Sequence, residues 1–246
     1  MIRTIWVALN LLLSTLPLSI IAITAALFGV KGRVYDQVGR TWSHWQLWAA
    51  GVRVRAEGLE HLTPDRAQIV VANHQSWYDV FALASLMKGP FRFVAKKELE
   101  RVPVWGRAWR VAGHISVDRG DTGSAIRSLE AAGDLMRAQN AKVVIFPEGT
   151  RAPGDRLLPF KKGAFMLALH TQVPIVPAGV RGGHDVMHKN DWRVRSGEII
   201  VRFGEAIPTE SYTLADRDAL MDRVRADVER LRSPVPKLDG VDVGDR

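Results

Sequence analysis

The stretch Ile69-Val70-Val71-Ala72-Asn73-His74-Gln75-Ser76-Trp77-Tyr78-Asp79 decides the fold of this 246-residue chain. Its first four residues form a short apolar run, which is typical of a buried strand. Ser76 is a residue type that caps helices, and a helix pattern over Tyr78–Lys88 follows it. A buried strand that leads through a polar turn into a capped helix is typical of an α/β domain.

The same alternation continues along the chain. Apolar runs predict further strands at Phe91–Ala95, Ile115–Asp118, Val143–Phe146, Ile175–Val180 and Ile199–Phe203. Helix patterns lie between or after them, at Lys97–Arg110, Gly123–Asn140, Gly163–Gln172 and Ser211–Arg232. We therefore predict an α/β domain over residues 53–232, with a mostly parallel central sheet covered by helices. Residues 233–246 contain two prolines and two glycines, and we expect them to form a loose tail.

The N-terminal region lacks charge over Thr4–Val30, a run of 27 residues. A straight helix of this length measures about 40 Å, which exceeds the roughly 30 Å hydrocarbon core of a bilayer. Pro17 lies in the middle, removes one helix hydrogen bond and predicts a kink or a break there. A tilted span and a shallow insertion into one leaflet both fit this pattern. A cleaved signal peptide is a third interpretation, because Arg3 precedes the apolar run.

A second amphipathic segment follows. Apolar residues recur at helical spacing, at Val34, Val38, Trp42, Trp45 and Ala49. Tryptophan favours the headgroup level of a membrane, where the ring is buried and its N–H stays hydrated. The alternative is a helix whose large aromatic side chains pack in the core. We predict that residues 1–52 form a two-helix membrane anchor.

The composition excludes several classes of protein. The chain has no cysteine, which rules out disulfides, cysteine-ligated metals and a thiol nucleophile. The formal net charge is +8, and residues 31–55 hold five basic residues against one acidic residue. A basic segment beside an apolar N-terminus indicates an anionic membrane surface as partner. Nucleic acid is disfavoured, because no RNP, zinc-finger or helix-turn-helix pattern accompanies the charge.

Familiar cofactor and hydrolase motifs are missing as well. The sequence contains no G-x-G-x-x-G, no G-x-x-x-x-G-K and no G-x-S-x-G, so dinucleotide, P-loop and nucleophile-elbow chemistry lack their signals. His184 and His188 have the i, i+4 spacing of metal ligands, but no cluster of further ligands accompanies them. We expect no metal ion and no resident cofactor, and we interpret these histidines as part of a surface loop.

His74 and Asp79 are the most informative pair. Five residues apart, the two side chains meet only if His74 lies in the turn and Asp79 in the first turn of the following helix. Asp79 would then accept the Nδ1 proton of His74 and leave Nε2 as a base. The alternative is a capping box, S-x-x-D, in which Asp79 only helps to start the helix.

A second group of polar residues follows the strand predicted at Val143–Phe146. The residues are Glu148, Gly149, Thr150 and Arg151, in a turn at the carboxyl end of a strand, where open α/β sheets bind ligands. Lys96 and Arg119 follow two other predicted strands. Three cations at three strand ends predict an anion site, since arginine binds phosphate in bidentate fashion. Ordinary surface charges are the alternative.

These residues resemble the sequence blocks of the glycerolipid acyltransferase superfamily. Asn73–Asp79 is similar to its N-H-x-S-x-x-D block, and Phe146–Arg151 is its F-P-E-G-T-R block unchanged. Three further segments resemble blocks of the family in order: Phe93–Leu99 the A-K-x-E-L segment, Gly113–Arg119 the block that ends in D-R, and Val173–Pro177 the V-P-I-V-P block. The likeness covers about residues 60–205. Ser116 and Ala152 depart from the usual pattern, outside the proposed catalytic groups.

The resemblance implies a catalytic mechanism. His74 would take the proton from the free hydroxyl of a lysophospholipid as the oxygen attacks an acyl thioester, and Asp79 would orient the imidazole. The donor would be acyl-CoA or acyl carrier protein, used as a co-substrate. The likeness is greatest to bacterial members that acylate the sn-2 hydroxyl of 1-acyl-sn-glycerol 3-phosphate and form phosphatidic acid, a step of phospholipid biosynthesis.

The resemblance also implies an acceptor site. Lys96, Arg119 and Arg151 would hold the phosphate, while Glu148 and Thr150 would bind the glycerol or shape the loop. We expect a location at the cytoplasmic face of the bacterial inner membrane. Two alternatives stay open: the same chemistry on another lysolipid, such as a lyso-aminolipid, and a non-catalytic membrane-binding protein. Acyl-chain length, the identity of the donor and the oligomeric state do not follow from the sequence.

Overall fold

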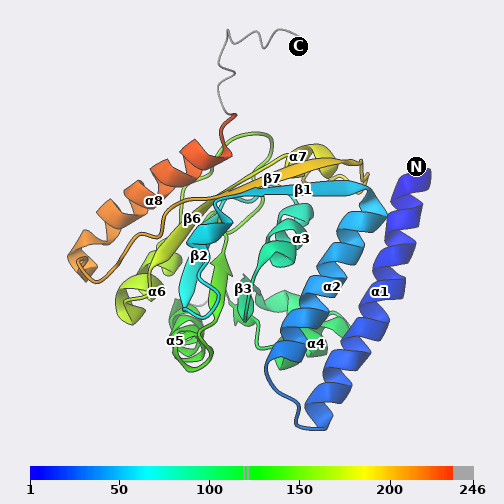
Figure 1. The fold of residues 1–246 in the computed structure, drawn as a ribbon, viewed down its shortest axis with the longest axis horizontal. Coiled ribbons are helices and arrows are strands. Elements are labelled where there is room, and N and C mark those ends of the chain that lie inside the picture. Colours follow the sequence, from blue (N-terminus) through cyan, green and yellow to red (C-terminus); the bar gives the residue numbers. More distant parts are fainter. Residues whose placement is uncertain (119, 121, 235–246) are drawn as a thin grey trace, which may run out of the picture.

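Figure 1 shows the protein as a computed structural model, which describes residues 1–234 except 119 and 121, and only the backbone of residues 122–127 and 129. The described part contains a seven-stranded sheet in the order β1-β7-β6-β2-β5-β3-β4. Its strands are β1 (Val52–Glu57), β2 (Gln68–Ala72), β3 (Phe91–Lys96), β4 (Ile115–Val117), β5 (Lys142–Ile145), β6 (Ile175–Arg181) and β7 (Gly197–Phe203). The α-helices are α1 (Ile2–Leu27), α2 (Arg33–Ala50), α3 (Trp77–Leu86), α4 (Trp105–Val111), α5 (Thr122–Gln139), α6 (Gly163–Thr171), α7 (Gly183–Val186) and α8 (Arg217–Arg232).

The sheet is mostly parallel, as the sequence predicts. Strand β2 pairs in parallel with β5 and β6, β3 pairs in parallel with β5 and β4, and β1 pairs in parallel with β7. The one antiparallel pair of the described sheet is β6 with β7. Because β2, β5, β3 and β4 are neighbours and run in the same direction, the residues after their carboxyl ends lie along one edge of the sheet.

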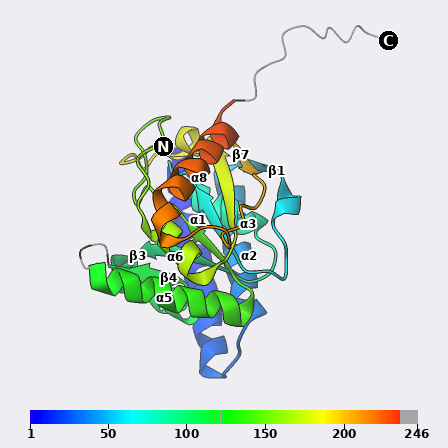
Figure 2. The same cartoon turned by 90° about the vertical axis from the view of Figure 1, so that its left-hand side faces the viewer.

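Helices cover both faces of the sheet (Figure 2). On one face, side chains of α1–α4 and α7 share a core with Val70, Val144 and Val176 of the central strands. On the other face, α5, α6 and α8 pack against Ile69, Val143 and other residues whose side chains point the opposite way. Alternate residues of β2 therefore enter different cores, which explains why all five of its residues are buried.

Two predicted elements differ from the structure. The single helix predicted over Lys97–Arg110 is wrong: a 3₁₀ turn, η2 (Lys97–Arg101), precedes the separate helix α4. Pro103 explains the interruption, since proline has no N–H and disfavours helical backbone in the residue before it. The helix predicted from Ser211 begins later, after the 3₁₀ turn η3 (Leu214–Asp216), which continues into α8.

Strand β1 and the short helix α7 have no counterpart among the predicted elements. In β1 every second residue is arginine or another polar residue, and its burial alternates in the same way. This alternation is typical of a half-buried edge strand, and it does not form a continuous apolar run. Two short helices complete the described secondary structure: the 3₁₀ helix η1 (Leu59–His61) and the four-residue α-helix α7.

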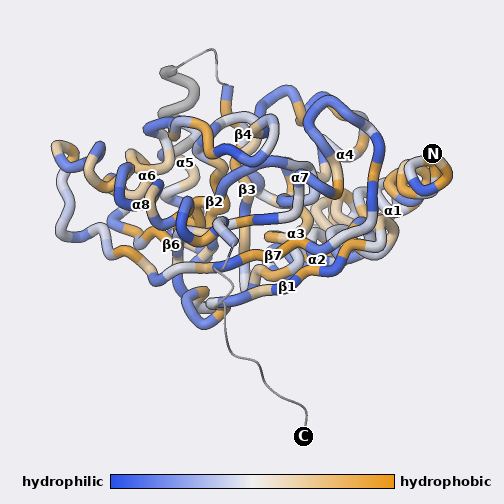
Figure 3. Tube along the Cα trace, turned by 90° about the horizontal axis from the view of Figure 1, so that it is seen from above, coloured by the Kyte–Doolittle hydropathy of each residue, from blue (hydrophilic) through white to orange (hydrophobic). Residues whose placement is uncertain are grey.

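Helix α1 runs through Pro17 without a break. The sequence predicts a kink or a break at this residue, and the predicted break is wrong. A proline removes one hydrogen bond, and α1 keeps its remaining bonds and packs along α2 and α4. The helix is long and apolar enough to cross a membrane. Figure 3 shows the apolar character of α1, and its exposed apolar side chains, including those of Leu12 and Leu13, indicate membrane association.

Helix α2 combines the two interpretations of its tryptophans. The Trp42 ring packs edge-on against Phe81 with 5.2 Å between ring centroids, so this residue belongs to the core. Trp48 is 66% exposed and contacts Trp6 of α1. Core packing therefore applies to Trp42, while Trp48 keeps a surface position that suits the headgroup level.

The division into an anchor of residues 1–52, a domain of residues 53–232 and a tail stays a prediction. Helix α2 packs closely on α3, so the two-helix element and the domain share one core in the structure. Most of the predicted tail, residues 235–246, lies outside the described residues.

Candidate active site

The turn after β2 brings His74 and Asp79 together. Nδ1 of His74 lies 3.0 Å from Oδ2 of Asp79. The same oxygen accepts the backbone N–H groups of Gln75 at 2.6 Å and of Ser76 at 2.7 Å. Ser76 is the N-cap of α3 and forms a capping box with Asp79. The predicted meeting of the two side chains and the capping box are both present, and the capping box brings the carboxylate to the imidazole. The catalytic role of the pair stays a prediction.

The surroundings of His74 define which nitrogen is available. Asp79 is fully buried, and the His74 ring stacks on Phe146 with 4.1 Å between centroids. A carboxylate can only accept a hydrogen bond, so its contact assigns the proton to Nδ1. Nε2 is then the nitrogen with a lone pair. The His74 side chain is 13% exposed, so the imidazole is in part open to solvent.

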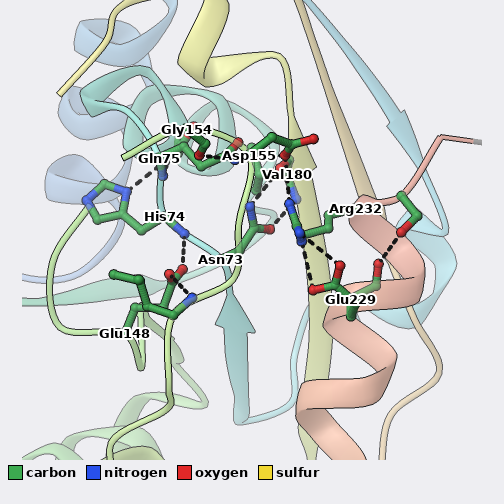
Figure 4. Close-up of polar contacts among 12 residues, drawn as sticks. Asn73, His74, Gln75, Glu148, Gly154, Asp155, Val180, Glu229 and Arg232 are labelled. Atoms are coloured by element: carbon green, nitrogen blue, oxygen red, sulfur yellow. Dashed lines mark hydrogen bonds and ion pairs between the residues drawn. The ribbon is translucent and has the colours of Figure 1, made fainter. Parts of the chain in front are cut away.

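Glu148 lies in the loop after β5 and holds the turn that carries His74. Its Oε1 accepts the backbone N–H of His74 at 2.7 Å, and its Oε2 accepts that of Leu158 at 2.9 Å (Figure 4). A further bond, from the Ala152 N–H to the His74 carbonyl at 2.7 Å, joins the same segments. Burial raises the pKa of Glu148 to about 7, although the two N–H donors favour its charged form. Of the two expected roles, the structure supports shaping the loop.

Gly149 and Thr150 lie in the same loop. Gly149 has a φ of +69°, a backbone conformation that favours glycine. A Cβ at this position would lie 2.8 Å from Cε of Lys161, whose flexible side chain would have to shift. The hydroxyl of Thr150 accepts a hydrogen bond from Nζ of Lys189 at 3.3 Å. Lys189 thereby adds a cation to this loop that the sequence patterns did not indicate.

The predicted cations differ in how they are held. The guanidinium of Arg151 lies over the Trp77 ring, 5.3 Å from its centroid, and partial burial lowers the pKa of Arg151. Lys96, at the end of β3, forms a 2.7 Å ion pair with Glu98, and about half of each side chain is exposed. Arg119 lies outside the described residues. Both described cations follow strands of the edge where His74 lies, and their convergence on one anion stays a prediction.

Several residues that hold the site were not predicted (Figure 4). The side-chain amide of Asn73 exchanges two hydrogen bonds with the backbone of Val180, at 2.7 and 2.8 Å. Asp155 accepts from Nε2 of Gln75 at 3.0 Å and from Arg232 of α8 at 2.7 Å. These partners lie more than 75 residues apart in each pair, so no local pattern could reveal them.

Gly183 closes the site on the other side of Asp79. A Cβ on Gly183 would collide with Oδ1 of Asp79. That oxygen has no hydrogen-bond partner among the described residues, while the other oxygen accepts three contacts. A side chain at position 183 would therefore displace the Asp79 carboxylate, so this position requires glycine.

His184 and His188 form a hydrogen-bonded pair, with 2.9 Å between Nδ1 of His188 and Nε2 of His184. Within residues 1–234, apart from the undescribed positions, no group of three His, Cys, Asp or Glu side chains is arranged to hold a metal ion. The arrangement around His74 consists of an imidazole whose proton Asp79 fixes on Nδ1, the buried carboxylate behind it and cations that follow neighbouring strands.

Comparison with known proteins identifies the family. The family model described as Acyltransferase matches residues 53–181. Human 1-acyl-sn-glycerol-3-phosphate acyltransferase alpha is 40% identical over 175 residues, which cover 71% of this chain and 62% of the human protein. The mouse protein of the same name is 36% identical over 196 residues, covering 79% of this chain and 68% of its own length. This chain belongs to the acyltransferase family, so the resemblance to the glycerolipid acyltransferases is confirmed.

A solved structure has the same fold. The crystal structure of the 1-acyl-sn-glycerophosphate (LPA) acyltransferase PlsC from Thermotoga maritima matches with a TM-score of 0.74 and 24% sequence identity. The match covers 96% of this chain and 99% of that one, which confirms the predicted α/β architecture. The plant relative from Limnanthes douglasii is 38% identical, and this chain spans 59% of its length. The chain thus spans about three fifths of the length of the human and Limnanthes douglasii relatives.

Proposed function

We propose that this protein transfers a fatty acyl group from a thioester to the sn-2 hydroxyl of 1-acyl-sn-glycerol 3-phosphate and forms phosphatidic acid. The observation that supports this proposal best is the contact of 3.0 Å between His74 and Asp79, which leaves Nε2 of His74 as a base. The names of the relatives point to the same acceptor.

The protein groups can perform the reaction without a covalent intermediate. Nε2 of His74 takes the hydroxyl proton while the oxygen attacks the thioester carbonyl carbon. The carbon–sulfur bond then breaks, and the thiolate leaves with the proton that the imidazolium returns. Asp79 stabilises the imidazolium, and a general base placed in this way contributes about 10²–10⁴-fold in rate. The donor is an activated thioester, supplied as acyl-CoA or acyl carrier protein, and no resident cofactor takes part.

The acceptor is bound through its phosphate. Lys96, Arg119 and Arg151 supply the positive charge, and arginine is well suited to phosphate because its N–H groups match two oxygens. Binding at this remote group orients the hydroxyl beside His74, which converts binding into positioning. Glu148 and Gly149 keep the loop in place. Thr150 would hydrogen-bond the glycerol.

The proposal includes a location. Helix α1 presents exposed apolar side chains, and both the acceptor and the product are lipids. We place the domain at the cytoplasmic face of a bacterial inner membrane, where α1 either spans the bilayer or inserts into one leaflet.

The test uses the full chain reconstituted in lipid vesicles, with acyl-CoA and acyl-carrier-protein donors and a panel of lysolipid acceptors. We expect thiol release that depends on 1-acyl-sn-glycerol 3-phosphate and is lost in His74→Ala, while His44→Ala, which changes an exposed histidine of α2, stays active. Full activity of His74→Ala would overturn the mechanism. Acylation of a phosphate-free lysolipid alone would overturn the acceptor.

A further inference from the structure

A large cavity lies beside the catalytic loop, on the sheet face that α5 and α6 cover. Its volume is about 910 Å³, which falls in the range of small-molecule sites. Apolar side chains form part of its wall, among them Val117, Ile145 and Leu167. Figure 2 shows this face of the molecule, with α1 and α2 behind the sheet. The cavity therefore lies on the face of the sheet opposite to α1 and α2.

The cavity shares its wall with the active site. Phe146, Pro147 and Gly149 of the catalytic loop line it, and the Phe146 ring stacks on His74 at 4.1 Å. Lys161 joins the two regions, since its backbone N–H donates to the Pro147 carbonyl at 2.8 Å and its side chain packs against Gly149. A molecule in this cavity therefore lies next to the segment that positions the base.

The lining of the cavity holds more basic than acidic side chains, and Asp218 interacts electrostatically with Lys162. Its lining includes four cations, Arg137, Lys161, Lys162 and Arg217, and two carboxylates, Glu130 and Asp134. Arg137 pairs with Asp134 and Arg217 with Asp218. Lys161 and Lys162 have no ion pair within the described residues, and both are exposed. Two adjacent unpaired ammonium groups at the rim of a cavity suit a ligand with several phosphate charges.

The smaller cavity on the other face has a different chemistry. It measures about 80 Å³, lies among α1–α4, and its lining contains no lysine or arginine. His114, which contributes to that lining, has a pKa lowered to about 3 by burial and is neutral. A polyanionic group therefore has no counter-charge there, whereas the α5–α6 cavity provides one.

We infer that the α5–α6 cavity binds the nucleotide end of the acyl donor, so that Lys161 and Lys162 contact the phosphates of acyl-CoA. This inference rests on the proposed function. The thioester then lies at the edge of the sheet beside His74, while the lysolipid approaches from the face that carries α1 and α2. A concave site of this volume matches a nucleotide, whereas a carrier protein needs a surface of about 800 Å².

The test changes both lysines to glutamine in the full chain, as Lys161→Gln with Lys162→Gln, in vesicles. The KM for acyl-CoA should rise about tenfold, since charge-assisted contacts to phosphate are lost, while the acceptor KM stays within twofold. The matched control is Arg66→Gln with Lys88→Gln, which removes the same charge from exposed positions before β2 and β3, at the amino ends of these strands. The control should leave both KM values unchanged.

A donor without phosphates separates the outcomes. With acyl-pantetheine, the lysine variant and the wild type should have the same KM. An increase in the acceptor KM instead would assign the lysines to the lysolipid and overturn the inference. A defect seen only with the acyl-carrier-protein donor would assign this surface to a carrier protein and would overturn it as well.

Direct binding distinguishes this inference from the proposed function. Adenosine 3′,5′-bisphosphate should bind the wild type in calorimetry and bind the lysine variant about tenfold more weakly, and this readout needs no turnover. Binding without any acylation of 1-acyl-sn-glycerol 3-phosphate would remove the proposed function and keep the nucleotide site. Acylation of 1-acyl-sn-glycerol 3-phosphate together with equal nucleotide affinity in both proteins would keep the proposed function and remove the nucleotide site.

Discussion

The catalytic turn and the cations along the same edge are built in different ways. Asp79 is fully buried, and its Oδ2 receives two backbone N–H groups besides the imidazole of His74. Lys96, in contrast, is about half exposed and its partner is the equally exposed Glu98. Arg151 is held by the face of a tryptophan ring. Under the proposed function, the base is organised before a substrate arrives, whereas the cations would exchange their present partners for a phosphate.

Replacement of Asp79 by asparagine should have the largest effect after loss of His74 itself. An amide oxygen can still accept the backbone N–H groups of Gln75 and Ser76, so the cap of α3 is kept. The amide does not stabilise an imidazolium, and kcat should fall by about 10²–10⁴. Single-turnover kinetics with a thermal unfolding control measure this. A kcat within tenfold of wild type would show that the contact serves only as a cap.

Replacement of Arg151 by alanine should act on acceptor binding. We expect the KM for 1-acyl-sn-glycerol 3-phosphate to rise about tenfold or more, because charged hydrogen bonds to phosphate are strong. Lys96→Ala should raise it less, since Lys96 is exposed and its charge is shared with Glu98. Steady-state kinetics at varied acceptor concentration compare the two variants. Equal losses of kcat in Arg151→Ala and Lys96→Ala, with an unchanged acceptor KM, would contradict the distinction between the turn that carries His74 and the cations that bind the acceptor.

Replacement of Arg232 by glutamine tests whether α8 supports the turn that carries His74 from outside the sequence blocks that resemble the family. Arg232 binds Asp155, which also binds Gln75, and the N–H of Gln75 binds Asp79. Loss of this tether should lower kcat about three- to tenfold through misplacement of the turn. Arg232→Lys, which keeps the positive charge, should retain part of the kcat that Arg232→Gln loses.

Arg230→Gln is the matched control for this prediction. Arg230 lies on the same helix, is 68% exposed, and pairs only with Asp227 in the described structure. Its replacement should leave kcat unchanged. Equal effects of the two arginine variants would assign Arg232 a general structural role in α8.

Replacement of Glu148 by glutamine should change the pH dependence of stability, beside a loss that is independent of pH because the amide can accept only one of the two backbone N–H groups. Burial raises the pKa of Glu148 from 4.5 to about 7, so the folded state holds this proton more tightly than the unfolded state. The contribution of Glu148 to stability is fully present below pH 4.5 and is lost as the pH rises towards 7. Urea unfolding at several pH values should therefore show a decline in the wild type that is weaker in Glu148→Gln. Parallel curves would contradict the raised pKa.

Local patterns predicted most of the fold and half of the site. Apolar runs such as Ile69–Ala72 are buried on both sides of a parallel sheet, so they identify strands directly. The meeting of His74 and Asp79 was predictable because the turn and the cap lie within six residues. Strand β1 forms no apolar run because its exposed arginines alternate with apolar residues, whereas the interruption between η2 and α4 has a local signal in Pro103.

The remaining part of the site depends on long-range contacts. Asn73 with Val180, and Asp155 with Arg232, join segments that no spacing rule relates. The role of Glu148 in holding the backbone of His74 likewise follows only from the pairing of β2 with β5. The cavity between α5 and α6 depends on how those helices pack on the sheet, which side-chain periodicity alone does not give.

The most direct test of the central claim, that His74 and Asp79 act as one catalytic unit, is a double-mutant cycle on kcat. The cycle compares His74→Ala, Asp79→Asn and the double variant with the wild type, using thiol release in lipid vesicles. Because the carboxylate acts through the imidazole, the double variant should be no slower than His74→Ala alone. If the two losses instead multiply, the carboxylate acts independently of His74 and the account is wrong.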